Sequence, residues 1–172
     1  MPTTITGTDG VSQVQTGAVE SGDLPAGSVI QVVQSGFDTE TVISSTSYVA
    51  VGLSASITPA SSSSKVLVFI DFLGSIRYDN ENSSQVADID LRRNGTSITE
   101  RSVTSRESGN IVNQNPMNVG LVHLDNPNAI STTTYELFIR VKLTDSSGGF
   151  YFNQFTNNPN ATSTITLMEI AG

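Results

Sequence analysis

Hydrophobic and polar residues alternate along most of this chain, which is the pattern of half-buried β-strands. The clearest segment is 133–143, where every second residue from Tyr135 to Leu143 is apolar. Similar patterns predict further strands at 28–33, 48–57, 65–73, 87–93, 96–103, 118–124, 150–155 and 163–170. Turn residues separate these segments at short intervals, and no segment shows a convincing helical pattern. The sequence therefore predicts an all-β fold, an antiparallel β-sandwich. It favours a jelly roll, with an immunoglobulin-like sandwich as the main alternative.

The segment 65–73 differs from the other strands because it is apolar on both faces. One face would carry Val66, Val68, Ile70 and Phe72, and the other Leu67, Phe69 and Leu73. A strand of this kind must be covered on both sides. The opposite sheet of a sandwich covers one face, so the other requires a loop or a neighbouring subunit. We therefore predict a subunit interface at Leu67, Phe69 and Leu73, and a homotrimer formed through it.

Asp71 interrupts this apolar strand. Because an unpaired buried carboxylate is costly, we expect it to be paired or hydrogen-bonded. Arg77, Arg140 and Lys142 are the candidate partners.

Two other segments mark the organisation of the chain. Asn94-Gly95 between two alternating segments is a strong signal for a two-residue hairpin turn, and 104–117 has the composition of a polar loop. Residues 1–27 hold isolated apolar residues in a Thr, Gly and Ser background and end at a Leu-Pro-Ala-Gly cluster. We therefore divide the chain into an N-terminal attachment arm, 1–27, and a β-sandwich domain, 28–172.

Composition and charge exclude several kinds of partner, targeting segment and binding site. The net charge is −8 and no basic patch is visible, so nucleic acid is not an expected partner. The first basic residue is Lys65, and the first 24 residues lack the basic and apolar regions of a secretory signal. No apolar run approaches the length of a membrane span. The chain has no cysteine, which excludes disulfides and thiolate metal sites.

Few residues suggest catalysis or metal binding. His123 is the only histidine and has no nucleophile motif to work with. Asp88 and Asp90 lie on one outward strand face beside Arg92, where we expect an open position and no raised pKa. The loop 79–82 is rich in oxygen ligands but lacks the EF-hand pattern. We therefore expect no enzyme activity and no catalytic, cofactor-binding or metal-binding residues.

Aromatic residues near the end of the chain divide between core and surface. Alternation places Phe150 and Phe152 on one side, which favours the core, and Tyr151 on the other. Tyr151 and Tyr78 are therefore the candidates for surface contacts. The loops 78–85, 104–117 and 153–161 are the candidate regions for touching a partner.

Three segments resemble a recurrent C-terminal β-sandwich domain of tail-fibre-like virion structural proteins of marine and cyanobacterial phages. They are LPAGSVIQVVQ (24–34), TSYVAVGLSASITPASSSSKVLV (46–68) and STITLMEIAG (163–172). DIDLRRNG (88–95) and the strand 135–141 are similar to the same domain. The motifs define no functional residues that could be transferred to this chain.

The resemblance implies a non-enzymatic component on the exterior surface of a bacteriophage virion, trimeric in most cases. It would be a short head or tail fibre, bound to other virion proteins through residues 1–27 and contributing to adhesion to a host glycan or protein. The alternative is a capsid decoration or cement protein that stabilises the head. Tail fibres usually carry long shafts, whereas at most 27 residues precede the domain here, which leaves both possibilities open.

Overall fold

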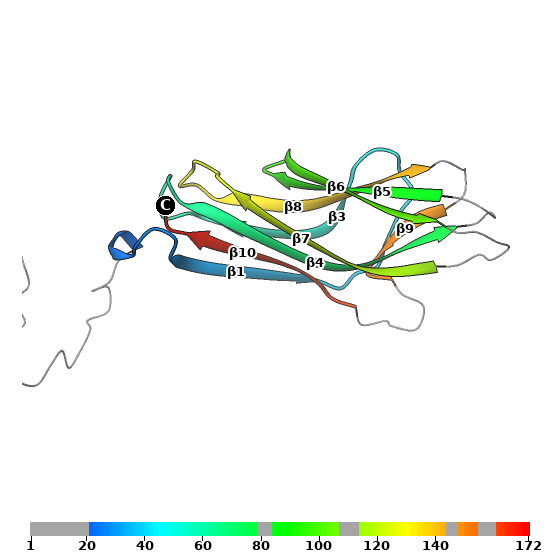
Figure 1. The fold of residues 1–172 in the computed structure, drawn as a ribbon, viewed down its shortest axis with the longest axis horizontal. Coiled ribbons are helices and arrows are strands. Elements are labelled where there is room, and N and C mark those ends of the chain that lie inside the picture. Colours follow the sequence, from blue (N-terminus) through cyan, green and yellow to red (C-terminus); the bar gives the residue numbers. More distant parts are fainter. Residues whose placement is uncertain (1–20, 79–83, 107–113, 144–147, 155–160) are drawn as a thin grey trace, which may run out of the picture.

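The computed structural model describes residues 21–78, 84–106, 114–143, 148–154 and 161–172 (Figure 1). A short 3-10 helix, η1 (Ser21–Asp23), precedes the first strand. The strands are β1 (Val29–Phe37), β2 (Thr41–Ile43), β3 (Val49–Ile57), β4 (Lys65–Tyr78), β5 (Ser84–Arg93), β6 (Thr96–Arg106), β7 (Gln114–Asp125), β8 (Thr133–Leu143), β9 (Gly148–Phe152) and β10 (Ser163–Ile170). The predicted all-β fold is confirmed.

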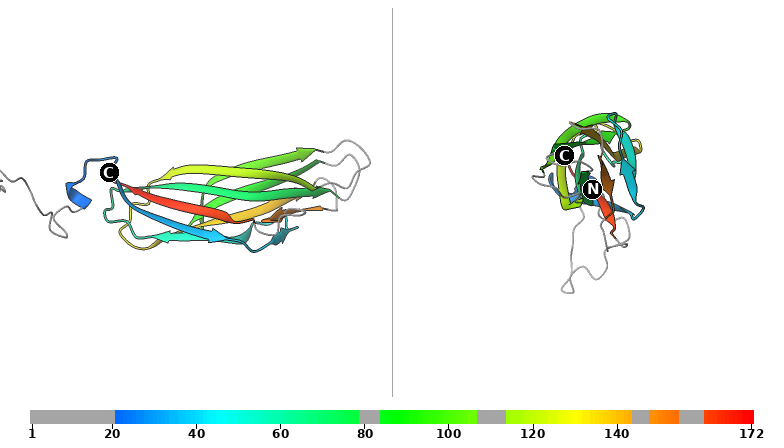
Figure 2. Two further views of the ribbon diagram at one scale, coloured as in Figure 1. Left: turned by 90° about the horizontal axis from the view of Figure 1, so that it is seen from below. Right: turned by 90° about the vertical axis from the view of Figure 1, so that its right-hand side faces the viewer.

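The strands form two antiparallel sheets that pack as a sandwich. Sheet A has the order β1-β10-β4-β9-β2, with β7 paired to the other edge of β4, and sheet B has the order β3-β8-β5-β6. The long strands of both sheets run along the same axis (Figure 2). Apart from the β5–β6 hairpin, the successive long strands from β1 to β10 cross from one sheet to the other. This connectivity is that of a jelly roll, as the strand pattern favoured.

Strand β4 organises sheet A because it is long enough to pair with two strands along one edge. Its first half, from Lys65 to Asp71, pairs with β10, and its second half, from Gly74 to Tyr78, pairs with β9. Asn153 lies where the two partners meet, with a positive φ of 57°. Its backbone N–H donates to Leu73 O, its side chain donates to Phe37 O, and its side-chain oxygen accepts a hydrogen bond from Ser163.

The hairpin turn between β5 and β6 is the one expected from the sequence. Asn94 and Gly95 both have positive φ, 49° and 81°, and Arg93 pairs directly with Thr96. Positive φ at both central residues is characteristic of a type I′ turn, whose twist matches that of the flanking strands.

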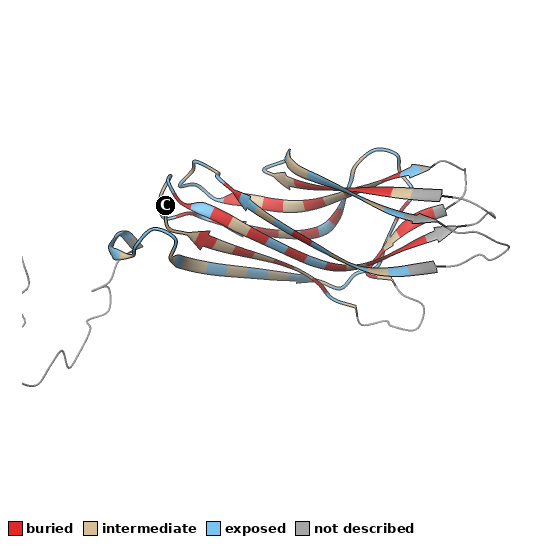
Figure 3. Cartoon of the chain, in the orientation of Figure 1, coloured by how far each residue is buried: buried red, intermediate tan, exposed pale blue. Residues whose placement is uncertain are grey.

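The core lies between the sheets and is built by alternate residues of the long strands, to which β1 and β6 contribute only partly buried side chains (Figure 3). Its fully buried large side chains include Leu53, Ile57, Phe72, Ile76, Ile89, Leu91, Tyr135, Leu137, Phe150 and Phe152. Phe72 contacts both Phe150 and Phe152, with ring centroids 6.3 and 5.3 Å apart. The prediction that Phe150 and Phe152 face the core is confirmed. Tyr151, between them in the strand, is half-buried on the other side of sheet A.

Some boundaries differ from the predicted ones. The segments 133–143 and 163–170 are strands with the predicted bounds, whereas β4 continues five residues beyond Leu73. The segment 104–117 is not one loop, since β6 extends to Arg106 and β7 begins at Gln114. These strand ends are polar. They are nevertheless strands, because backbone hydrogen bonds to neighbouring strands form the sheet whether or not the side chains are apolar. The short strand β2 was not predicted.

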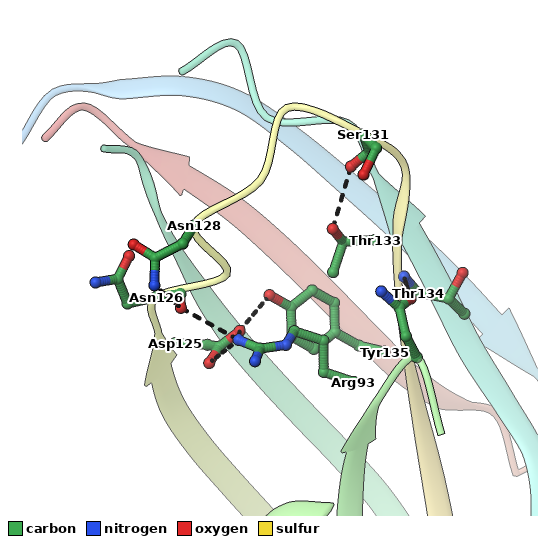
Figure 4. A network of polar contacts seen from close by, with 9 residues as sticks. Arg93, Asp125, Asn126, Asn128, Ser131, Thr133, Thr134 and Tyr135 are labelled. Carbon is green, nitrogen blue, oxygen red and sulfur yellow. Dashed lines mark hydrogen bonds and ion pairs between the residues drawn. The ribbon is translucent and has the colours of Figure 1, made fainter. Parts of the chain in front are cut away.

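Two buried carboxylates form hydrogen-bond networks at the end of the sandwich where β1 begins and β10 ends. Asp125 in sheet A accepts hydrogen bonds from Arg93 Nη1, at 2.8 and 2.9 Å, and from the hydroxyl of Tyr135, at 2.7 Å (Figure 4). Arg93 and Tyr135 belong to sheet B, so this network joins the two sheets. Burial and the hydrogen bond to Asp125 raise the pKa of Tyr135 well above its usual value, which keeps the hydroxyl a donor.

The second carboxylate, Glu169, is fully buried and fixes the turn between β3 and β4. It accepts hydrogen bonds from Gln31 Nε2 at 2.5 Å and from the backbone N–H of Ala60 at 2.7 Å. Burial by itself would raise the pKa of Glu169, but the hydrogen bonds from Gln31 and the backbone of Ala60 outweigh it, and the pKa lies below its usual value.

This contact makes stability dependent on pH. Because the pKa of Glu169 is lower in the folded state, its contribution is present above the ordinary value of 4.5 and is lost as the pH falls through the folded-state value. Glu169→Gln should therefore lower the free energy of unfolding at pH 7, and the difference from wild type should shrink towards pH 3. Urea unfolding at several pH values measures it. Glu40→Gln is the control for loss of an exposed carboxyl group, and a Glu169→Gln effect independent of pH would contradict the prediction.

Candidate interaction faces

The outward face of sheet A is apolar across four neighbouring strands. Leu67 of β4 lies in one row with Val32 of β1, Met168 of β10 and Leu124 of β7. In the next row Phe69 lies beside Val122, whereas the positions on β10 and β1 are the polar residues Thr166 and Gln34. At the end of the sheet, Val29 pairs with Ile170. We call these side chains the sheet A face: Val29, Val32, Leu67, Phe69, Val122, Leu124, Met168 and Ile170.

Much of this apolar surface is open to solvent. Val29, Val32, Val122 and Leu124 are each more than half exposed, and Phe69 is 37% exposed. Single exposed apolar residues are common on protein surfaces, but contiguous apolar patches larger than a few hundred Å² mark interaction sites. The second apolar side of β4 is thus only partly covered by the described part of this chain, with Leu67 and Leu73 half-buried and Phe69 exposed.

The predicted interface residues Leu67, Phe69 and Leu73 all point to this outward side. Leu67 and Phe69 lie within the sheet A face. Leu73 is further along β4 and lines a separate hollow of about 380 Å³ together with Asp71, Pro116, Asn118 and Thr162.

Charges are rare on the described outward side of sheet A. Within β1, β4, β7 and β10, the side chains described there include only two charged groups, Lys65 and Asp71, and both are exposed. The expectation that Asp71 would be paired is wrong: no ion pair or hydrogen bond of its carboxylate is found among the described residues. Two of its three candidate partners, Arg140 and Lys142, lie in sheet B and bind Asp88 instead. The side chain of the third, Arg77, is outside the described set.

The outward face of sheet B has the opposite character, because two of its carboxylates, Asp88 and Asp90, are paired with basic side chains of the same face. Asp88 accepts hydrogen bonds from Arg140, Lys142 and Ser102, with Arg140 Nη2 at 2.8 Å and Lys142 Nζ at 2.7 Å. Asp90 binds Arg92 Nε at 2.6 Å and the hydroxyl of Ser97 at 2.6 Å.

The expectation of an open position for Asp88 and Asp90 is therefore wrong. Both side chains point outward, as alternation required, yet they are 2% and 0% exposed. The long side chains of neighbouring strands fold over them, which periodicity within one strand cannot reveal. Burial by itself would raise the pKa of Asp88, but the hydrogen bonds from Lys142, Ser102 and Arg140 outweigh it and lower that pKa. A general acid of a glycosidase needs the opposite shift.

Aromatic rings complete this arrangement, which we call the sheet B face. The guanidinium carbon of Arg92 lies 4.1 Å from the ring centroid of Phe138, and that of Arg140 lies 4.4 Å from the ring of Tyr48. Stacking on a ring and pairing with a carboxylate together restrict both arginines. Asp88 and Asp90 of the sheet B face are thus satisfied by side chains of the same face and do not need a partner.

Asp88→Asn should lower the free energy of unfolding by about 1–3 kcal/mol, because it leaves Arg140 and Lys142 side by side without an anion. The cost is limited because their side chains are 30% and 55% exposed and can turn to water. Lys142→Met removes only one exposed partner and should cost less than about 1 kcal/mol. Urea unfolding at pH 7 measures both. Equal costs for the two variants would show that Asp88 is not the centre of the cluster.

The remaining candidates occupy separate places. Tyr151 lies between Val42 and Ser75 on the outward side of sheet A. Tyr78 is the last residue of β4, and its side chain is not among those that the structure describes. His123 is half-buried on the same side of β7 as Leu121 and Asp125.

The loop 79–82 also lies outside the described residues. Among the residues that the structure describes, no three His, Asp or Glu side chains gather to hold a metal ion. No helix in the described ranges is long and apolar enough to cross a membrane.

Most residues of the sheet A face were not identified from the sequence. The signal was present, since 118–124 and 163–170 also carry apolar residues at both odd and even positions, such as Leu121 with Val122 and Leu167 with Met168. The two-sided pattern that identified Leu67 and Phe69 thus recurs in the strands on either side of them.

Comparison with known proteins yields structural neighbours only. No protein-family model matches the sequence, and no curated protein is significantly similar to it. Solved structures of similar shape include a subviral particle of infectious bursal disease virus VP2, with 16% identity over 84% of this chain and a TM-score of 0.43. T=1 particles derived from the same virus give 11% identity over 84% of this chain and a TM-score of 0.42.

This chain spans 34% and 37% of the length of those two proteins. At these scores the neighbours carry no argument about function. The strand order of the chain itself makes it an all-β, antiparallel jelly-roll sandwich with one apolar and one ion-paired outer face.

Proposed function

We propose that this chain is a non-enzymatic structural protein of a bacteriophage virion, a short head or tail fibre on the exterior surface. The observation that carries the proposal is the contrast between the two outer faces. The sheet B face pairs Asp88 and Asp90 with its own basic side chains, whereas the sheet A face leaves five exposed and three half-buried apolar side chains for another molecule to cover. Such a domain is built for assembly. The sequence resemblance to phage fibre domains supports a virion as the assembly.

The two ends of the sandwich support the proposed division of labour. Residues 27 and 28 are hydrogen-bonded to the C-terminal segment, with Gly27 N–H donating to Ala171 O and Ala171 N–H donating to Ser28 O. The attachment arm therefore joins the sandwich at the end where β1 begins (Figure 1). The strand ends that flank the connections β4–β5, β6–β7 and β8–β9 lie at the opposite end. An arm bound to other virion proteins would direct this distal end towards a host glycan or protein, with Tyr78 and Tyr151 as candidate contacts.

Self-association is part of the proposal. A partner subunit would cover Leu67 and Phe69 and extend to Leu73. The resemblance to fibre domains implies a homotrimer, and a two-fold dimer is the other simple arrangement that covers one face per subunit.

A capsid decoration or cement protein is the alternative function. It is favoured by the position of the sheet A face, whose most apolar rows lie at the same end as the attachment arm. Both could therefore contact one capsid surface. In that role the protein would stabilise the head and would not touch the host.

Deletion of residues 1–27 tests the attachment role. Phage particles assembled with the truncated chain should lack it, while circular dichroism and thermal unfolding of the purified truncated chain show an intact sandwich. Incorporation at the level of the full-length chain would refute the role of the arm. Particles without the protein then separate the two functions: an adsorption defect with normal heat stability supports the fibre, and the reverse supports the cement protein.

A further inference from the structure

The sheet A face is complementary to itself, in charge and in shape, when a second copy is turned end for end. We infer that the face is covered by a second copy of this chain, packed sheet to sheet about a two-fold axis that crosses β4 at the level of Val68. This rests on the self-association included in the proposed function and specifies its symmetry.

The two charged residues on the outward side of β4 support this arrangement. Along the outward side of β4 the order is Lys65, Leu67, Phe69, Asp71, so the two charges stand about 20 Å apart at opposite ends of the apolar rows. An axis at the level of Val68 brings Lys65 opposite Asp71 of the second copy, and Asp71 opposite Lys65. Leu67 then meets Phe69 of the second copy near the axis. Two symmetric ion pairs would flank a centre that is apolar on β4 and β7, while Val32 and Met168 would face Gln34 and Thr166 of the second copy.

The sizes of the side chains in the end rows of the sheet A face also support this arrangement. The row of Lys65 contains the bulky residues Val29 and Ile170, whereas the row of Asp71 contains Gly36, Thr164 and Gly120. The same two-fold axis that pairs the charges places Val29 over Gly36 and Ile170 over Thr164. No heavy atom lies within 4 Å of the position of a Cβ at Gly120, so the row is open there, whereas the methyl group of Thr162 lies 3.4 Å from the same position at Gly36. Large residues would face small ones at both ends, as face-to-face packing of sheets about 10 Å apart requires.

A three-fold arrangement of the same face does not share these properties. If three copies placed their sheet A faces around an axis along the strands, equivalent residues would meet at the same height. Three copies of Lys65 would then gather at one level and three of Asp71 at another, and like charges in proximity repel. The bulky rows would likewise meet one another. Charge and size therefore favour two-fold pairing over a trimer through this face.

Charge exchange tests the inference directly, by sedimentation equilibrium of the full 172-residue chain. Wild type should be dimeric at micromolar concentration. Lys65→Asp and Asp71→Lys should each raise the dissociation constant about ten-fold, because each replaces two attractions by two repulsions. The double variant Lys65→Asp/Asp71→Lys should restore the wild-type constant. Glu40→Lys, on the β1–β2 connection, changes the net charge as Asp71→Lys does and should leave the dimer intact.

Phe69→Glu places carboxylates at the apolar centre and should give a folded monomer, checked by circular dichroism. A dimer in which the double exchange fails to restore affinity would overturn the two-fold arrangement. A trimer insensitive to the exchanges would do the same, yet would keep the self-association in the proposed function. A wild type that stays monomeric at about 100 µM, well above the micromolar upper end of the dissociation constants of standard-size interfaces, would overturn both. The virion role would still be decided separately by particle incorporation.

Discussion

Asp125→Ala is expected to lower the free energy of unfolding by about 3–5 kcal/mol, the range observed when one partner of a buried charged network is removed. The substitution leaves Arg93 without its anion and the hydroxyl of Tyr135 without an acceptor, and the Tyr135 side chain is fully buried. Arg93 is 29% exposed and can partly return to water, but Tyr135 cannot. Because a domain of this kind is stable by only about 5–15 kcal/mol, the loss is a large fraction of the total.

Tyr135→Phe is the matched comparison for this prediction. It removes one hydrogen bond but leaves the pair of Asp125 with Arg93 in place, so it should cost about 1–3 kcal/mol. Thermal unfolding at pH 7 should rank wild type above Tyr135→Phe and Tyr135→Phe above Asp125→Ala. A loss below about 1 kcal/mol for Asp125→Ala would show that the network does not hold the two sheets together.

Gly74→Ala is expected to cost about 1–3 kcal/mol, because it forces an additional carbon atom into a packed core. A Cβ at this position would lie 2.3 Å from Cζ of Phe150, a ring that is fully buried and in contact with Phe72. Phe150 cannot move away without disturbing that contact. The substitution tests whether the ring packs directly on the glycine backbone where β4 changes partners.

A double-mutant cycle makes the test specific. Phe150→Leu removes the ring and should itself be destabilising, but Gly74→Ala in that background should cost much less than in wild type. Gly120→Ala is the control, since Gly120 lies in the neighbouring strand β7 with nothing within 4 Å of the added carbon. Its effect on urea unfolding should be small. Additive costs for Gly74→Ala and Phe150→Leu would contradict the packing argument.

The pattern within one segment was sufficient to predict the structural features that depend on that segment alone. The strands 133–143 and 163–170, the Asn94-Gly95 turn and the opposite orientation of Phe150 and Tyr151 all follow from period-two alternation or from positive φ at a turn. These features depend on residues within a few positions of one another. The two-sided composition of β4 belongs with them, since it identified Leu67 and Phe69 as outward and apolar.

The burial of Asp88 and Asp90 could not be predicted from the pattern within one strand. Asp88 and Asp90 alternate like solvent-facing residues, and only the tertiary structure places Arg140, Lys142 and Arg92 over them. Asp71, in the most apolar strand, looked like a buried and paired group but is exposed. In each case burial is set by side chains from other strands, which the alternation within one strand does not report.

The sequence by itself determined the all-β fold, the direction in which most strand residues point, and the presence of more apolar surface on β4 than one sheet contact can cover. The tertiary structure decided which strands lie side by side. It joins residues as far apart in the chain as Val29 and Ile170, or Leu67 and Leu124, into one apolar face. It also gives sheet B a face that pairs its own charges. The physical reason is that alternation is a local property of an extended chain, whereas a surface patch is made by the order and register of strands brought together from distant positions.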